Sequence, residues 1–164
     1  MQYMMKRRED QEALLKGLLA MPDVLDASFQ DLSIDDASRP GPDGSSPVEI
    51  CWHLADLEAE GYSVRIRRLL VEDHPKLPDF NGEAIAKARD YRRLSLSDAL
   101  ALFRAARRAN VTMLRNLTES QWTRSGVQEG VGTVSVCDVP TMMAEHDAGH
   151  HSEVKAWIAA RRES

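Results

Sequence analysis

The sequence predicts an all-α protein built as a four-helix bundle, and three observations support this prediction. Four stretches of the chain carry apolar residues at helical spacing. Helix-starting residues precede several of these stretches. Strand signals are scarce, because the one run rich in β-branched residues, 127–136, is broken by Gly130 and Gly132. A chain of 164 residues can bury one sizeable core, so we expect a single domain over residues 1–164.

The first helix is expected over Met5–Ala20, with leucines gathered on one side. Pro22 follows directly, and we expect it to interrupt the helix because proline lacks the N–H that an α-helix needs. A second short helical segment then continues to about Gln30. The stretch 33–46 is rich in proline and glycine, which predicts a loop.

The second helix has the clearest start in the sequence. In Ser46-Pro47-Val48-Glu49 the serine supplies a cap, the proline suits the first helical position and the glutamate closes a capping box. The helix is expected to continue to Val71. A connection over 72–95 follows, with some helix around 82–89. Because that connection can reach along the whole bundle, the second and third helices can lie parallel.

The third helix is predicted from the Ser95 cap to about Leu117. A glycine-rich loop over 126–133 separates it from the fourth helix. That last helix is expected to start at Ser135 or Asp138 and to continue to Arg162, which completes a bundle of four amphipathic helices.

Three of the five histidines lie on core-facing stripes of these helices. His146 and His150 are one turn apart on the fourth helix, and His53 lies on the second. Two imidazoles at i, i+4 with a third from a facing helix leave coordination positions open, as catalytic metal sites do. We therefore predict that these three histidines bind a metal. The alternative is a structural bundle in which they are hydrogen-bonded core residues.

Other polar residues near these stripes are candidates for catalysis and binding. Glu49 and Asp56 flank His53 at about one turn, and either can orient its imidazole or act as a base. Arg107 and Asn110 interrupt the apolar stripe of the third helix. Arg107 is predicted to hold a carboxylate of a thiol or substrate, with a snorkelling side chain as the alternative. Asn110 is predicted to take part in cofactor binding.

The remaining histidines and the cysteines are predicted to have no role in the site. His74 is expected at the surface, as is His151, which points about 100° away from His150 on the helix. Cys51 and Cys137 lack metal-binding or redox spacing and are expected to be small buried apolar residues.

Composition restricts the partners. A net charge of −5 and a pI near 5.5 give no general attraction for nucleic acid or an anionic membrane. No apolar stretch is long enough to span a bilayer. The first residues, MQYMMKRRED, have no apolar segment behind them, and two cysteines make no disulfide framework, so we expect a cytoplasmic protein.

Three segments then resemble a known family. They are SPVEICWHLADLEAEGYSVRIRRLL, YRRLSLSDALALFRAARRANVTMLRNLTESQWTRSG and AEHDAGHHSEV. Their order and spacing, from about Ser33 to Arg161, resemble the DinB/YfiT-like superfamily. The resemblance implies an up-down-down-up bundle, with a divalent metal, nickel or zinc first and iron or manganese next, held by His53, His146 and His150. It also implies a homodimer. One departure is Gln128, where relatives often carry a histidine after the pattern W-x-R-x-G.

The first hypothesis for function is therefore a metal-dependent enzyme acting on a small molecule. The resemblance implies thiol-transferase chemistry with a low-molecular-weight thiol, such as bacillithiol or mycothiol, in which the metal lowers the pKa of the bound thiol. A metal-dependent hydrolase is the nearest alternative, and a non-catalytic metal-binding stress or sensor protein is another. Asp147 is a candidate to hydrogen-bond one of the metal-binding histidines and so orient its ring.

Overall fold

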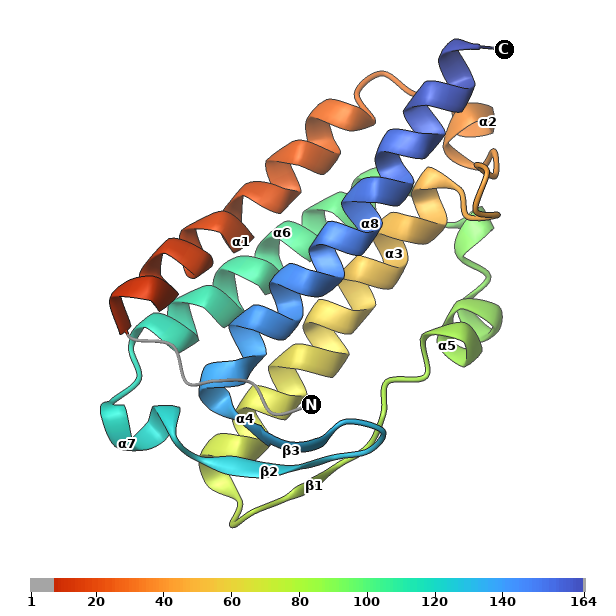
Figure 1. The fold of residues 1–164 in the computed structure, drawn as a ribbon. Helices are drawn as coiled ribbons and strands as arrows, with labels where there is room; N and C mark the ends of the chain where they lie inside the picture. The colour runs from red at the N-terminus through yellow and green to blue at the C-terminus, as the bar shows by residue number, and fades with distance from the viewer. Residues whose placement is uncertain (1–7, 164) are drawn as a thin grey trace.

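The structure, a computed structural model, describes residues 8–163, with side chains from residue 10 onward. Four long helical segments lie side by side, as predicted (Figure 1). They are α1 (Arg8–Ser28), the continuous run α3 (Pro47–Asp56), η1 (Leu57–Tyr62) and α4 (Ser63–Val71), then α6 (Leu96–Arg115) and α8 (Val139–Arg162). The four-helix bundle is confirmed. The predicted first residues, from Met5 to 7, lie outside the described part.

The helices follow the predicted up-down-down-up order. In Figure 1, α1 and α8 run in one direction, while α3–α4 and α6 run in the other. α6 packs against α3 and α1, and α1 also packs against α8. The long connection after α4 returns along the bundle through β1 (Lys76–Leu77), α5 (Gly82–Arg89) and the 3-10 turn η2 (Tyr91–Arg93). It thereby allows α3 and α6 to lie parallel.

The predicted helix starts are confirmed by their caps. The Ser46 hydroxyl accepts from the backbone N–H of Glu49, whose carboxylate accepts from the Ser46 N–H in return. Ser95 caps α6 by accepting from the Asp98 N–H. These local hydrogen bonds satisfy N–H groups that have no partner within their own helix.

The prediction that Pro22 interrupts the first helix is wrong. α1 continues through Pro22 to Ser28. A proline at this position leaves the carbonyl of Leu18 without its usual N–H donor. The Nη1 atom of Arg107, on α6, donates to that carbonyl at 2.9 Å. A side chain from a neighbouring helix thus satisfies the group that the proline leaves free.

The second long helix contains a π-helical segment that the sequence did not predict. η1 joins α3 to α4 over Leu57–Tyr62. The Nδ2 atom of Asn110 donates to the Glu58 carbonyl at 3.0 Å and to the Glu58 carboxylate at 3.0 Å. Asn110 therefore holds the wider turn in place from α6, since a π-segment disturbs the regular carbonyl ladder.

The structure also corrects the prediction of a glycine-rich loop over 126–133, because this stretch forms most of a short β-hairpin. β2 (Ser125–Gln128) pairs antiparallel with β3 (Gly132–Ser135), and β1 pairs parallel with β2. Gly130 and Gly132 have positive φ angles of 75° and 104°, which glycine adopts at little cost. The glycines that argued against a strand therefore make the turn between two strands. The other short elements are α2 (Ile34–Ala37), α7 (Glu119–Trp122) and the 3-10 turn η3 (Val136–Asp138).

The interior has two apolar clusters with a polar layer between them. The first cluster includes Leu18, Leu57, Ile66, Leu69, Val111, Leu114 and Met143. The second includes Leu25, Phe29, Ile50, Leu54, Phe103, Val154 and Trp157. Buried polar side chains lie between the two clusters on three of the long helical segments: Asp56 on α3, Arg107 and Asn110 on α6, and Asp147 on α8. None of the helices in the described part has the length and apolar content needed to cross a membrane.

Candidate metal centre

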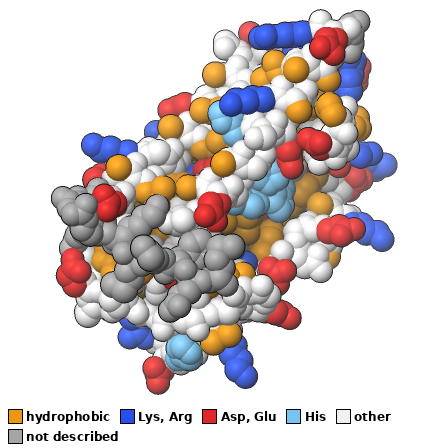
Figure 2. Space-filling model, viewed as in Figure 1, with side chains coloured by type: hydrophobic (Ala, Val, Ile, Leu, Met, Phe, Trp, Pro, Cys, Tyr) orange, Lys and Arg blue, Asp and Glu red, His pale blue; other side chains and the backbone are white. Residues whose placement is uncertain are grey.

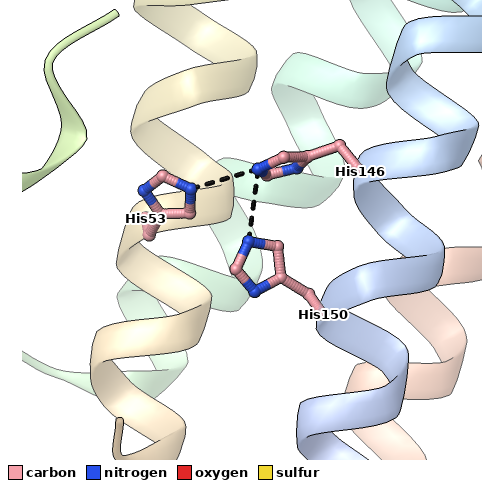
Figure 3. Close-up of side chains that lie close together, drawn as sticks. All are labelled: His53, His146 and His150. Atoms are coloured by element: carbon pink, nitrogen blue, oxygen red, sulfur yellow. Dashed lines mark hydrogen bonds between the residues drawn. The ribbon is translucent and has the colours of Figure 1, made fainter. Parts of the chain in front are cut away.

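The three predicted histidines meet across the gap between α3 and α8. His53 extends from α3, and His146 and His150 extend from successive turns of α8 (Figure 3). The Nε2 atom of His146 lies 3.2 Å from Nε2 of His53 and 3.2 Å from Nε2 of His150. All three offer a ligand atom within 4.8 Å of the others. The i, i+4 spacing on α8 places both rings on the side that faces α3.

This arrangement fits a metal ion better than it fits mutual hydrogen bonding. A neutral imidazole nitrogen carries either one hydrogen or one lone pair, so Nε2 of His146 cannot form a full hydrogen bond with both neighbours. Nitrogen ligands bind zinc at about 2.0–2.1 Å, which places two of them about 3.3 Å apart in a tetrahedral site. The two 3.2 Å separations match that requirement. The chemistry of the donor set therefore suits a divalent cation.

The electrostatics of the site keep its nitrogens available. Burial, with the charge of His150 adding to it, lowers the pKa of His53 to about 4. Burial, and after it the charges of His150 and His53, lower the pKa of His146 to about 3. Both rings are consequently neutral near pH 7, and a neutral imidazole is the form that binds a metal.

A carboxylate on the same helix orients one of the ligands. The Nδ1 atom of His150 lies 2.8 Å from Oε2 of Glu153, which can only accept when ionised. That contact places the ring hydrogen on Nδ1 and leaves the lone pair on Nε2 directed at the other histidines. No role was predicted for Glu153 from the sequence. Its position three residues after His150 was the available signal.

The site is half-buried beneath the long connection. Gly82, at the start of α5, lies so close to His53 that a Cβ there would stand 2.8 Å from Cε1 and 2.9 Å from Nδ1. The Phe80 ring lies 6.3 Å from the His53 ring, and the Tyr62 ring lies edge-on to His146 at 6.5 Å. In Figure 2 histidine surface reaches the outside in the middle of the face shown, so the site remains open to small molecules.

The two carboxylates predicted beside His53 make their hydrogen bonds elsewhere. Glu49 belongs to the Ser46 capping box and pairs with Arg92 at 2.9 Å. Asp56 is buried, accepts from the Tyr91 hydroxyl and pairs with Arg89 at 2.6 Å. Neither carboxylate hydrogen-bonds His53, so neither orients it as the sequence suggested.

Arg107 and Asn110 point into the polar layer of the bundle. Arg107 is 1% exposed, and its guanidinium binds the Asp147 carboxylate through two hydrogen bonds of 2.7 and 2.9 Å. It also lies 3.1 Å from the carboxylate of Glu58, which Asn110 binds from the same helix. Of its nitrogens, Nε alone has no partner in the described part of the chain. The guanidinium expected to hold a ligand is thus occupied by the protein's own carboxylates.

The other residues singled out in the sequence lie apart from this cluster. Cys51 and Cys137 are buried, as predicted, and burial raises the pKa of each thiol. His74 is exposed, as predicted, whereas His151 is half-buried beside a groove between α1 and α8. Gln128 is buried in β2, and its Oε1 has no partner among the described residues.

The fold and the site together define a class: a four-helix bundle with a candidate metal centre of three histidines between two facing helices. The family profile of the DinB superfamily matches residues 18–154, and the chain belongs to that superfamily. It is similar in structure to YfiT from Bacillus subtilis, described as a probable metal-dependent hydrolase with an unusual four-helix bundle topology. That match has a TM-score of 0.87 at 19% identity and covers 99% of this chain and 93% of the other. A search of curated proteins found no match.

Proposed function

We propose that this protein is a metal-dependent hydrolase that cleaves a small-molecule ester or amide at the three-histidine site. One observation carries the proposal: three imidazoles, two of them held neutral by burial, converge through their Nε2 atoms on one half-buried point. When bound there, a divalent ion with open positions lowers the pKa of water toward 7 and so supplies a nucleophile at neutral pH.

The chain's own residues would prepare that reaction. His53, His146 and His150 hold the ion, and Glu153 keeps His150 in the tautomer that presents Nε2. Gly82 and Phe80 cover one side of His53, which limits the access of bulk water. Addition of water to the substrate carbonyl and loss of the alcohol or amine complete the hydrolysis without a further reactant.

Hydrolysis takes precedence over the thiol-transferase chemistry that the sequence first suggested. The description of the similar Bacillus subtilis structure supports a metal-dependent hydrolase. In the described residues no feature favours a particular thiol. Thiol transfer and metal sensing without turnover are therefore treated as outcomes of the experiment.

The remaining expectations belong to the same proposal. Nickel or zinc suits a three-imidazole site best, with iron or manganese next. Two free, buried cysteines are consistent with a reducing cytoplasm. A homodimer is implied only by the family resemblance.

Metal analysis is the first test. Protein purified without chelators and reloaded with nickel or zinc should hold about one ion per chain. The His53→Ala, His146→Ala double variant should hold less than about a tenth of that, while His151→Ala, a neighbouring half-buried histidine, should match the wild type. Equal metal in the double variant and the wild type would remove the basis of the proposal.

Turnover is the second test. The loaded protein is incubated with a panel of esters and amides, with and without low-molecular-weight thiols, and acid release and thiol loss are followed separately. We expect metal-dependent acid release that disappears in the double variant. Thiol-dependent loss of an electrophile would instead assign transferase chemistry. Stoichiometric metal without any turnover would favour a sensor.

A further inference from the structure

His53 has no carboxylate or carbonyl to orient its ring among the described residues. Its hydrogen-bond contact there is with another ligand, since its Nε2 atom lies 3.2 Å from Nε2 of His146. The two carboxylates that flank it in the sequence, Glu49 and Asp56, bind other groups. A metal-binding histidine is normally held in place by a group behind it. For His53 that support has to come from packing.

The packing contact comes from Gly82, the first residue of α5. Figure 3 shows one ring nitrogen of His53 directed toward His146 and the other directed away from it. On the far edge of the ring, a Cβ at position 82 would lie 2.8 Å from Cε1 and 2.9 Å from Nδ1. Unbonded carbon atoms pack best at about 3.5–4.0 Å. Only a residue without a side chain therefore fits against the imidazole as it stands.

The backbone itself does not require glycine at this position. Gly82 lies in a helix and its φ angle is not positive, unlike those of Gly130 and Gly132 in the hairpin turn. Glycine is also a poor helix former, so helix propensity favours another residue here. The contact with the His53 ring is the feature that explains the glycine.

α5 is held in place by ion pairs more than by burial. None of its residues is buried. Its last residue, Arg89, pairs with the carboxylates of Asp56 at 2.6 Å and Glu60 at 2.7 Å. Asp56 is itself buried, and it lies three residues after His53 on α3. The carboxylate predicted to orient His53 thus binds one end of α5, and the other end of α5 contacts the ring.

We propose that α5 positions the metal centre: Gly82 keeps Nε2 of His53 directed at the other two ligands, and the Arg89 ion pairs keep α5 against α3. This inference rests on the proposed function, because it concerns metal binding by the three histidines. A side chain at position 82 would turn the imidazole about its two rotatable bonds, which costs the fold little. The same turn would take one of three ligands out of reach of the ion. Gly82 and Arg89 are therefore positioning residues.

Gly82→Ala tests the ring contact. Competition with a chromogenic chelator should show about tenfold to hundredfold weaker zinc binding, the loss typical when a ligand loses its support. The urea midpoint of the metal-free protein should stay close to that of the wild type, whereas a glycine needed only for folding would lower it. Gly149→Ala is the matched control, because a Cβ there would meet no atom within 4 Å. Wild-type affinity in Gly82→Ala, or equal loss in both variants, would overturn the inference.

A double-mutant cycle shows whether Gly82 acts through His53. In the His53→Ala background, Gly82→Ala should weaken zinc binding by less than about twofold, because no imidazole is left to displace. A loss as large as in the wild-type background would mean that position 82 acts by another route, and the positioning role would fall.

Arg89→Met tests the other end of α5 and serves if Gly82→Ala does not fold. We expect severalfold weaker zinc binding, because α5 loses the ion pairs that hold it against α3. Arg93→Met is the control, since this exposed arginine pairs with Asp90 outside α5. It should bind zinc as the wild type does. Unchanged affinity in Arg89→Met, or the same loss in both variants, would contradict the proposed role of the ion pairs.

Turnover separates this inference from the proposed function. If Gly82→Ala loses zinc affinity while the zinc-loaded wild type hydrolyses no ester or amide, the positioning role stands and hydrolysis falls. If the loaded wild type hydrolyses a substrate and Gly82→Ala matches it in both zinc affinity and rate, hydrolysis stands and the positioning role falls.

Discussion

Two polar clusters lie in the middle layer of the bundle, and they differ in whether the chain itself supplies their partners. The cluster around Arg107 joins α6 to α8 and η1 through the carboxylates of Asp147 and Glu58. The histidine cluster joins α3 to α8 through three nitrogens that have no complementary group between them. The clusters meet at the adjacent residues His146 and Asp147. One turn of α8 therefore contributes to both clusters, through side chains that point about 100° apart.

The difference teaches how to tell a structural polar cluster from a functional one. A buried charge that finds its counter-charge within the chain holds helices in register. Lone pairs that converge on one point suit a cation. Variants that remove one partner from each cluster can test this distinction.

The largest effect is expected from Arg107→Met, which leaves Glu58 and Asp147 buried without a cation. Breaking a buried ion pair on one side costs about 3–5 kcal/mol of unfolding free energy. Urea unfolding of the metal-free protein measures it. Arg108→Met, the neighbouring exposed arginine, should change stability by less than about 0.5 kcal/mol. A loss below about 1 kcal/mol for Arg107→Met would contradict the view that its charge network holds the bundle together.

The next effect concerns the pH dependence of the metal-free protein. His53 and His146 have pKa values of about 4 and 3 in the fold, against 6.5 in the unfolded chain. Between pH 6.5 and 3 the unfolded state thus binds more protons, so stability rises with pH across this window and is lost toward acid. We expect about 2–3 kcal/mol of such loss, because both rings are partly exposed.

The control for that pH effect is the His53→Ala, His146→Ala double variant. Thermal unfolding across the same window should show a flatter pH profile, whatever its absolute stability. An unchanged slope in the double variant would mean that other groups produce the acid sensitivity.

The smallest effect is expected from Glu153→Gln. Loss of the carboxylate weakens the orientation of His150, and changes of this kind cost about tenfold to hundredfold in metal affinity. Competition with a chromogenic chelator measures the affinity. Unfolding free energy without metal should change by less than about 0.5 kcal/mol. Glu163→Gln makes the same chemical change at the exposed end of α8 and should leave affinity unchanged; an equal effect from it would remove the role of Glu153.

The main helices and the meeting of the histidines could be predicted from local signals. Ser46 and Ser95 mark helix starts through short-range hydrogen bonds that are readable in sequence. The spacing of His146 and His150 places their rings together whatever the rotation of the other helices. Metal binding by these residues stays a prediction.

The features that were missed depend on contacts between distant segments. Arg107 donates to the carbonyl that Pro22 leaves free in α1, and Asn110 donates to a carbonyl of the π-segment. Neither side chain is near its acceptor in sequence. β1 is two residues long, and its pairing partner β2 lies about fifty residues away, so no local alternation reveals it.

The hydrogen bond from Arg107 to the Leu18 carbonyl, which Pro22 leaves without a backbone donor, affects which substitutions the chain can tolerate. A variant that replaces Pro22 restores the N–H that Leu18 lacks, and one part of what Arg107 supplies then becomes dispensable. The cost of losing Arg107 thus depends on which residue occupies position 22. Positions 22 and 107, on different helices, therefore form an epistatic pair. Which substitutions α6 tolerates at position 107 depends in part on whether α1 carries a proline at position 22.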